Sequence, residues 1–279
     1  MTLAARAAVA LASLALPLGA APALAQGAPP PADTITSTAP LFTRHDALIL
    51  GGFAAATAAA VPLDLRVAQR LQYRQTQENR FFRRTAQVST RLVEPGALVA
   101  AAALYGVGRL GGNERMATLG VRGGEAVFLA LGSTVVIKGL AGRARPYVSN
   151  DSNPRDFGLG RGFFKEQFRS FPSGHTTTAF ALAAATTAQA AAWCDDCAWY
   201  VGPVMYGGAA LAGLARMYDN KHWASDVMVG AAIGAVSGRK VVRYHETHGR
   251  TRVDRWLLAG NVRGGASGVS AARVLILPY

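Results

Sequence analysis

Apolar residues gather in six stretches of the chain, separated by polar linkers. These stretches contain no Asp, Glu, Lys or Arg, and they are Ala47–Leu63, Pro95–Gly108, Ala126–Ile137, Ser170–Cys194, Cys197–Ala215 and Val227–Gly238. Their Ala and Gly residues suit close packing of one helix against another. The pattern predicts an all-α fold, a helical bundle of about six Ala/Gly-rich helices.

The lengths of these stretches bear on whether the bundle crosses a membrane. A spanning helix needs about 20 predominantly apolar residues, whereas runs of about 10 to 14 are more typical of buried core helices. Only Ser170–Cys194 and Cys197–Ala215, with 25 and 19 residues, approach that length. We therefore expect a bundle that is soluble or lies on a membrane surface, with an integral form of fewer spans as the alternative.

The first residues of the chain have the pattern of a secretory signal peptide. Arg6 precedes an apolar stretch, Ala7–Leu18, and Ala23-Leu24-Ala25 is a small-x-small cleavage site. We expect residues 1–25 to be removed, with an uncleaved anchor helix as the alternative, and residues 26–44, rich in Pro, Ser and Thr, to be a flexible leader. The mature protein is then expected in the periplasm or outside the cell.

The rest of the chain divides into a helical domain, residues 45–250, and a C-terminal tail, residues 251–279. The tail has Gly-rich breaks and ends in a β-prone run, Arg273–Leu277, which could form a hairpin. No function for the tail follows from its sequence.

The charge of the chain indicates an anionic partner. It has 29 Lys and Arg against 16 Asp and Glu, a formal net charge of +13, which favours nucleic acid, an anionic membrane or a phosphorylated substrate. The signal peptide argues against nucleic acid. The Arg-rich stretch Arg66–Arg91 would be a cytoplasmic loop in a membrane protein. In a secreted protein it is a solvated helix face that could bind anionic head groups, which is the interpretation we favour.

Two cysteines, Cys194 and Cys197, frame the turn between two predicted helices. In an oxidising compartment they are expected to form a local disulfide. A redox-active pair is the alternative, but no βαβ pattern surrounds it, and a zinc site would need two further ligands nearby.

Three short stretches carry candidate chemistry, and the first is basic. Lys138 and Arg145 are about two turns apart if they share a helix, and Pro146 then ends that helix. Taken alone, basic residues here are explained by the dipole at a helix C-terminus.

The second stretch begins a helix. Ser173 is a good N-cap, Gly174 lets a ligand approach the backbone, and His175 adds a titratable group beside free helix amides. Such a feature alone is more often structural than functional.

The third stretch contains Arg216, His222 and Asp226. His222 and Asp226 are four residues apart, so on a helix they share a face, and the carboxylate can hold one ring nitrogen. The other nitrogen is then free to act as a nucleophile.

Together the three stretches supply what phosphoryl transfer needs without a metal. Cations cover the phosphoryl oxygens, helix amides stabilise developing charge, one His attacks and another protonates the leaving oxygen. The chain has only five His, so two of them in these settings are informative.

The order of these motifs resembles the type 2 phosphatidic acid phosphatase (PAP2) superfamily, which includes bacterial non-specific acid phosphatases and vanadium haloperoxidases. The motifs are Lys-x6-Arg-Pro, Pro-Ser-Gly-His and Arg-x5-His-x3-Asp, over roughly residues 95–245. The resemblance implies that His222 is the nucleophile, oriented by Asp226, and that His175 is the general acid. It assigns the phosphoryl group to Lys138, Arg145, Ser173, Gly174 and Arg216, and implies no metal or other cofactor.

One position departs from the family pattern, because Ala215 stands where the third motif usually has Ser. If that hydroxyl supported the phosphate or Arg216, its loss would cost about 0.5–1.5 kcal/mol. We expect such a change to slow the enzyme without silencing it.

We expect a phosphatase acting on phosphorylated lipids, such as phosphatidate or an isoprenyl pyrophosphate. The same chemistry on soluble phosphomonoesters is the nearest alternative. A vanadium haloperoxidase is a further alternative, although that subfamily tends to be much longer. A catalytically inactive anion-binding protein is the last, and the presence of both His and the Asp argues against it.

Overall fold

The structure is a computed structural model, and it describes residues 40, 42–93, 96–248 and 251–258. Throughout these residues the regular structure is helical and no strand occurs, so the all-α fold class is confirmed. The predicted signal peptide and the predicted hairpin residues, 273–277, lie outside the described residues.

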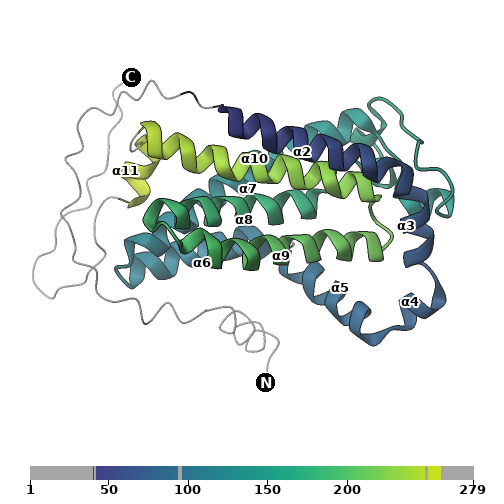
Figure 1. The fold of residues 1–279 in the computed structure, drawn as a ribbon, viewed down its shortest axis with the longest axis horizontal. Coiled ribbons are helices and arrows are strands. Elements are labelled where there is room, and N and C mark those ends of the chain that lie inside the picture. The colour runs from purple at the N-terminus through teal and green to yellow at the C-terminus, as the bar shows by residue number, and fades with distance from the viewer. Residues whose placement is uncertain (1–39, 41, 94–95, 249–250, 259–279) are drawn as a thin grey trace, which may run out of the picture. The chain divides into compact units, whose positions relative to one another are not determined.

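Figure 1 shows the helices, and each of the six predicted segments overlaps one of them, namely α2, α6, α7, α8, α9 or α10. Their bounds are α2 Arg44–Ala60, α3 Asp64–Leu71, α4 Arg74–Glu78, α5 Arg80–Val93, α6 Gly96–Leu110, α7 Glu114–Ala141, α8 Gly174–Trp193, α9 Cys197–Tyr218, α10 Ala224–His248 and α11 Arg252–Leu258. Short 3-10 turns occur at η2 Val61–Leu63, η3 Pro146–Ser149, η4 Arg161–Phe163 and η5 Glu166–Phe168.

Helix α8 packs against α7, α9 and α10, and these elements bring the three motifs together. The approach of α10 to α8 is close because glycine faces the α8 backbone. A methyl group at Gly230 or Gly234 would overlap the carbonyl oxygen of Ser173 or Thr177. As a result the Ser173 amide donates a hydrogen bond of 3.0 Å to the carbonyl oxygen of Asp226, which joins the second motif to the third.

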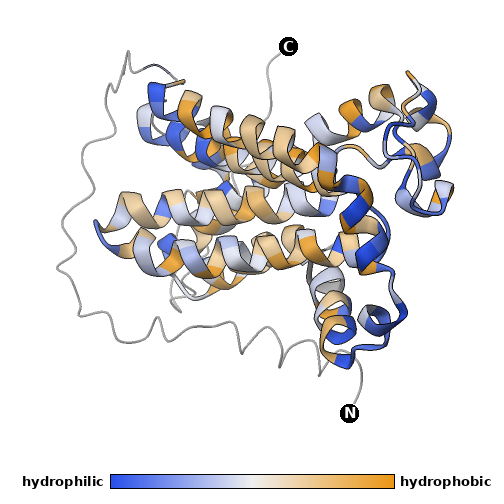
Figure 2. Cartoon of the chain, turned by 45° about the vertical axis from the view of Figure 1, so that its right-hand side comes forward, coloured by the Kyte–Doolittle hydropathy of each residue, from blue (hydrophilic) through white to orange (hydrophobic). Residues whose placement is uncertain are grey.

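Two helical stretches, Arg44–Leu71 and Glu114–Ser149, are long and apolar enough to cross a membrane by length and composition. They differ from Ser170–Cys194 and Cys197–Ala215, the two segments whose charge-free lengths came closest to a membrane span. Helix α7 is longer than its charge-free run, Ala126–Ile137, because the helix also contains Arg122 and Glu125. Both of these charged residues form ion pairs. In the most apolar 18-residue part of each stretch, 11% is buried in Arg44–Leu71 and 33% in Glu114–Ser149. The rest of the protein therefore covers little of either apolar surface. Figure 2 shows apolar residues along the middle of the helices and polar residues toward their ends.

Two other sequence features have a defined place. Cys194 and Cys197 form a disulfide between the end of α8 and the start of α9. The Arg-rich stretch forms α3, α4 and α5, and six of its arginines are exposed. They are Arg66, Arg70, Arg74, Arg80, Arg83 and Arg84.

Candidate active site

A cavity of about 420 Å³ lies where α6, α7, α8 and the C-terminal end of α9 meet. Five of the predicted site side chains line it, together with Gly174 and with Arg169, which sequence reasoning missed. The five are Lys138, Arg145, His175, Arg216 and His222.

The basic motif is split between a helix and the segment that follows it. Lys138 lies in the last turn of α7 and donates a hydrogen bond of 2.7 Å to the carbonyl oxygen of Arg169. Helix α7 ends at Ala141 because Gly142 adopts a left-handed conformation, with φ of 52°. The expectation that Lys138 and Arg145 share a helix was therefore wrong, although both line the cavity.

Arg145 reaches the cavity from this extended segment. Its Nη2 atom lies 3.1 Å from Glu166, whose side chain is 78% exposed. Its Nε atom is buried and has no hydrogen-bond partner among the described residues. This guanidinium can therefore donate to an anion in the cavity.

The second motif begins α8 at the edge of the cavity. Ser173 occupies the N-cap position, but its hydroxyl accepts from the Thr176 hydroxyl at 2.8 Å and makes no bond to a helix amide. A methyl group at Gly174 would lie 3.4 Å from the Cε atom of Lys138, so that lysine extends over the start of the helix. A helix N-terminus beside a lysine is well suited to bind an oxyanion.

His222 precedes α10, in the turn after α9, and its ring is held by a backbone carbonyl. Its Nδ1 atom lies 2.7 Å from the carbonyl oxygen of Ser170. Because a carbonyl only accepts, Nδ1 carries the hydrogen, and in the neutral ring Nε2 keeps its lone pair. This tautomer is the one that a nucleophilic Nε2 requires.

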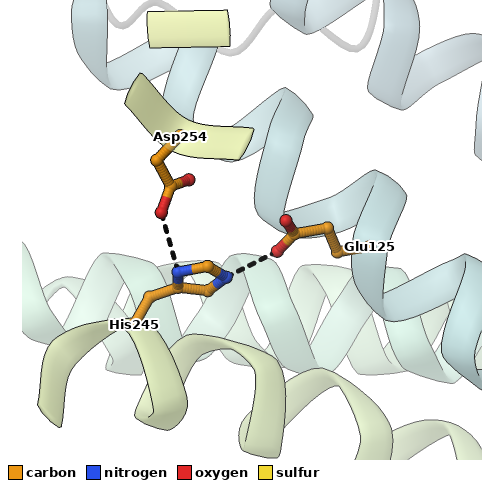
Figure 3. A group of neighbouring side chains, drawn as sticks. All are labelled: Glu125, His245 and Asp254. Carbon is orange, nitrogen blue, oxygen red and sulfur yellow. Dashed lines mark hydrogen bonds and ion pairs between the residues drawn. The ribbon is translucent and has the colours of Figure 1, made fainter. Parts of the chain in front are cut away.

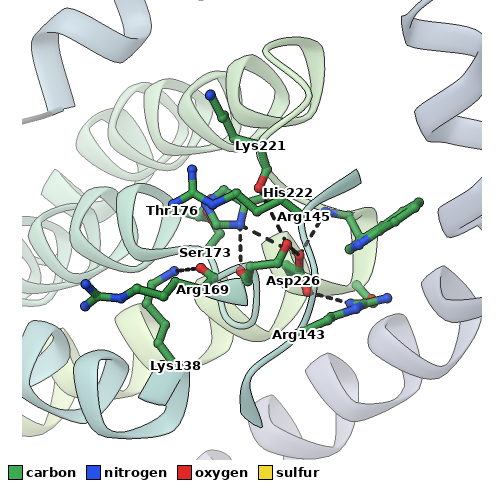
Figure 4. Close-up of polar contacts among 12 residues, drawn as sticks. Lys138, Arg143, Arg145, Arg169, Ser173, Thr176, Lys221, His222 and Asp226 are labelled. Carbon is green, nitrogen blue, oxygen red and sulfur yellow. Dashed lines mark hydrogen bonds and ion pairs between the residues drawn. The ribbon is translucent and has the colours of Figure 1, made fainter. Parts of the chain in front are cut away.

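Asp226 acts on His222 less directly than the motif spacing suggests. Its Oδ2 atom is 3.7 Å from Nδ1, which is too long for a hydrogen bond. That oxygen instead accepts from the Ser170 hydroxyl at 2.6 Å and from the Trp223 amide at 2.9 Å (Figure 4). The carboxylate therefore holds the residue whose carbonyl holds the imidazole, and the direct bond expected from sequence is absent.

The other oxygen of Asp226 belongs to a network that sequence reasoning missed. Arg143 donates to it at 2.5 Å, and the same guanidinium pairs with Asp64 at 2.7 Å. Arg143 has a local signal, since it lies two residues before Arg145. Asp64 has none, because it is 79 residues away from Arg143 along the chain.

Burial and the surrounding cations determine the charge state of both histidines. Burial lowers the pKa of His175 to about 3, and the positive charge of Arg216 adds to the effect. Burial likewise lowers the pKa of His222 to about 3, with Asp226 acting in the opposite direction. Burial alone would raise the pKa of Asp226, but His222, Arg143 and Ser170 hold it below its usual value. At neutral pH both imidazoles are neutral and Asp226 is ionised.

A second polar cluster joins α7, α10 and α11 (Figure 3). The Nε2 atom of His245 is 2.6 Å from Glu125, and its Nδ1 atom is 3.0 Å from Asp254. Ligand atoms of these three residues lie within 4.8 Å of one another, a spacing that a metal ion could use. Both ring nitrogens already face a carboxylate, however, and Arg122 takes the other oxygen of Asp254 at 2.5 Å. We interpret the cluster as an ion-pair network that attaches α11 to α7 and α10.

The main cavity combines four basic side chains, two buried imidazoles and the N-terminus of a helix in an all-α bundle, a set of groups suited to binding an oxyanion. Residues 121–250, which carry all three motifs, match the model of the PAP2 superfamily. This segment, a little under half of the chain, is therefore similar to the PAP2 superfamily.

Two relatives are similar to parts of the chain. A lipid A 1-phosphatase from Porphyromonas gingivalis is 44% identical over 69 residues, which make up 25% of this chain and 15% of the relative. The chain thus matches only a small part of that protein's length. A crystal structure of a transmembrane PAP2-type phosphatidylglycerolphosphate phosphatase from Bacillus subtilis is 15% identical. It has a TM-score of 0.48 and is aligned over 75% of this chain and 100% of its own.

Proposed function

We propose that the protein is a metal-independent phosphatase that hydrolyses a phosphorylated lipid through a phosphohistidine intermediate. One observation supports the substrate class above all. The cavity that contains both histidines continues along an apolar wall from α6 and α7. That wall consists of Ala97, Leu98, Val127, Leu131 and Val135.

In the first step the phosphoryl group binds to Lys138, Arg145, Arg216 and the amides that begin α8. The Nε2 lone pair of His222 attacks phosphorus, so that a P–N bond forms as the bond to the leaving oxygen breaks. Protonated His175 donates its proton to that oxygen, and the lipid alcohol leaves. The three cations balance the charge on the phosphoryl oxygens, which is the role a metal would otherwise fill.

In the second step water replaces the alcohol. Neutral His175 takes a proton from the water as its oxygen attacks phosphorus, the P–N bond breaks and inorganic phosphate leaves. His222 returns to its neutral form with the hydrogen still on Nδ1, bonded to the Ser170 carbonyl. His175 must be protonated when substrate binds, and the negative charge of the phosphate favours this.

The apolar surface supports access from a membrane. Val135 lines the cavity and is also 48% exposed on the outside of α7, so the apolar wall reaches the molecular surface. It is surrounded on α7 by other exposed apolar residues, namely Phe128, Leu129, Val136 and Leu140. A lipid tail lying against α7 could occupy the wall while its phosphate reaches His222.

The exposed arginines of α3–α5 support contact with an anionic membrane surface as a partner. Phe81 and Phe82 are exposed beside them, a combination typical of segments that lie at a lipid interface. The signal-peptide pattern of residues 1–25 supports a periplasmic or extracytoplasmic location. Together they favour a membrane-associated enzyme outside the cytoplasm.

The test compares kcat/KM for phosphatidate in mixed micelles with kcat/KM for p-nitrophenyl phosphate, both in EDTA, with His222→Asn as the inactive control. A strong preference for the lipid supports the proposal. Preference for the soluble ester would make the protein a non-specific acid phosphatase. Activity on neither substrate above the control, or its loss in EDTA, would overturn the proposal.

A pair of neighbouring variants tests the apolar wall. Val135→Asn places a polar group on the wall, whereas Val136→Asn places one on the exposed surface beside it. We expect Val135→Asn to raise KM for the lipid and to leave the soluble ester unchanged, and Val136→Asn to do neither. Equal effects of both variants on the two substrates would contradict a tail in the cavity.

A further inference from the structure

We propose that Asp64 is a positioning residue for phosphoryl transfer, acting through Arg143 on Asp226 and His222. The proposal rests on the function proposed above and extends it to a residue outside the segment that matches the PAP2 model. Asp64 begins α3 and is 1% exposed. Neither Asp64 nor Arg143 lines the cavity, so neither is placed to touch substrate.

Asp64 makes several hydrogen bonds at the base of the site. Its Oδ2 atom accepts from Arg143 at 2.7 Å and from the Ser225 hydroxyl at 2.6 Å. Its Oδ1 atom accepts from the Ser225 amide at 2.8 Å. Ser225 is the residue before Asp226, so Asp64 holds the backbone that carries the catalytic carboxylate.

Arg143 lies between the two carboxylates and is 3% exposed. One end of its guanidinium donates to Asp226 at 2.5 Å, and the other donates to Asp64 at 2.7 Å. Nε and Nη2 also donate to the Pro154 carbonyl, at 2.9 and 2.6 Å. The plane of the guanidinium is therefore fixed, because a rigid fork with partners on each side has no other orientation that satisfies them.

Figure 4 shows Arg143, Asp226 and His222 side by side in this network. Arg143 fixes Oδ1 of Asp226, Oδ2 then accepts from Ser170, and the carbonyl of Ser170 holds the Nδ1 hydrogen of His222. Without Asp64, Arg143 would be a buried cation with Asp226 as its remaining carboxylate. We expect the guanidinium to shift, and the direction of the Nε2 lone pair of His222 to change as a result.

The structure provides a matched control in Asp46. This carboxylate is also buried, also lies in the N-terminal helices, and also pairs with a buried cation, Lys240 of α10. It makes no contact with Arg143, Ser225 or Asp226 among its hydrogen bonds. Asp64→Asn and Asp46→Asn therefore each remove a buried ion pair, of which only the Asp64 pair leads to the site.

The experiment measures kcat, KM and melting temperature for both variants of the full chain. We expect Asp64→Asn to lower kcat by about 10- to 100-fold, the loss typical when a partner that orients a metal-binding side chain is removed, with KM changed less than about threefold. Asp46→Asn should lower the melting temperature similarly and keep kcat within about twofold. Asp64→Glu, which keeps the charge, should restore part of kcat. Equal effects of Asp64→Asn and Asp46→Asn on kcat would overturn the proposal.

Two further measurements keep the test decisive. If Asp64→Asn does not fold, Ser225→Ala removes one hydroxyl from the network, and kcat should fall by about 2- to 10-fold, as expected for one hydrogen bond. An unchanged kcat would overturn the proposal.

If the wild-type protein hydrolyses no phosphate ester, the proposed function fails by itself. The imidazole NMR signal of the His222 Nδ1 proton then tests Asp64, since an unchanged signal in Asp64→Asn would contradict it.

Discussion

His222 donates its Nδ1 hydrogen to the carbonyl oxygen of Ser170 at 2.7 Å, whereas the carboxylate of Asp226 lies 3.7 Å from the same nitrogen. Orientation of the nucleophile is therefore shared by a backbone group and a side chain. Substitution cannot remove the Ser170 carbonyl, but it can remove the Ser170 hydroxyl. A Ser170 variant therefore tests the contribution of Asp226 while His222 keeps its backbone partner.

Ser170→Ala should weaken catalysis without abolishing it. The variant loses the 2.6 Å bond from the Ser170 hydroxyl to Asp226 and keeps the carbonyl that holds His222. We expect kcat to fall by about 10- to 150-fold, because a hydrogen bond to a charged group contributes about 1.5–3 kcal/mol. His222→Asn, measured alongside, should have no activity above background. Equal loss in the two variants would show that Ser170 does more than hold the carboxylate.

Binding of an oxyanion should cause the protein to take up a proton. In the free protein the pKa of His175 is about 3, because the ring is buried and Arg216 lies nearby, so it is neutral at pH 7. A bound dianion offsets those cations and raises the pKa of His175 toward and above neutrality. Calorimetry with tungstate at pH 7, in buffers of different ionisation enthalpy, measures the proton count.

We expect uptake of up to one proton per site in the wild-type protein and a smaller uptake in His175→Gln. Tungstate keeps its charge at this pH, so the proton does not come from the ligand. Binding heats that are independent of the buffer would contradict the role of His175 as general acid.

Arg145→Lys should weaken oxyanion binding more than the same substitution at an exposed arginine does. Arg145 lines the cavity and its buried Nε atom has no hydrogen-bond partner among the described residues, and a lysine cannot supply the planar fork. We expect vanadate inhibition to weaken by about 10- to 100-fold, corresponding to one or two charge-assisted bonds. Arg155→Lys, at an exposed arginine on the same linker, should leave the inhibition constant unchanged. Similar effects of the two variants would exclude a direct contact.

Ala215→Ser should leave activity almost unchanged, although it restores the usual family residue. Ala215 is 3% exposed and packs with Ala86 of α5 and with Tyr218, and it does not line the cavity. A serine hydroxyl there can bond to the carbonyl four residues earlier in α9. We expect kcat/KM within about twofold of wild type. A tenfold increase would show that the hydroxyl supports the phosphate after all.

The features that sequence predicted well are those encoded locally. Lys138, His175 and His222 are each marked by their immediate neighbours, and the structure places all three around one cavity. Asp64 could not be found in this way, because its partner Arg143 is 79 residues distant and no periodicity connects them. The end of α7 was missed for a different reason. Gly142 ends the helix by a left-handed conformation, and nothing in the composition of that stretch distinguishes it from a helical glycine.

Asp254→Asn should make the protein less stable at neutral pH and less sensitive to acid. Burial alone would raise the pKa of Asp254, but bonds from Arg122 and the Thr251 amide hold it below its usual value. A carboxyl whose pKa is lower in the folded state contributes stability above its unfolded pKa, about 3.9. That contribution is lost as the pH falls through the folded-state pKa. The wild-type melting temperature should therefore fall more steeply than that of Asp254→Asn below about pH 4. Parallel curves would contradict the ion-pair interpretation. A metal site would also contradict it. In that case Zn²⁺ would raise the melting temperature of the wild type but not of Asp254→Asn, and EDTA would reverse the rise, because a metal would take the place of the pairing with Arg122.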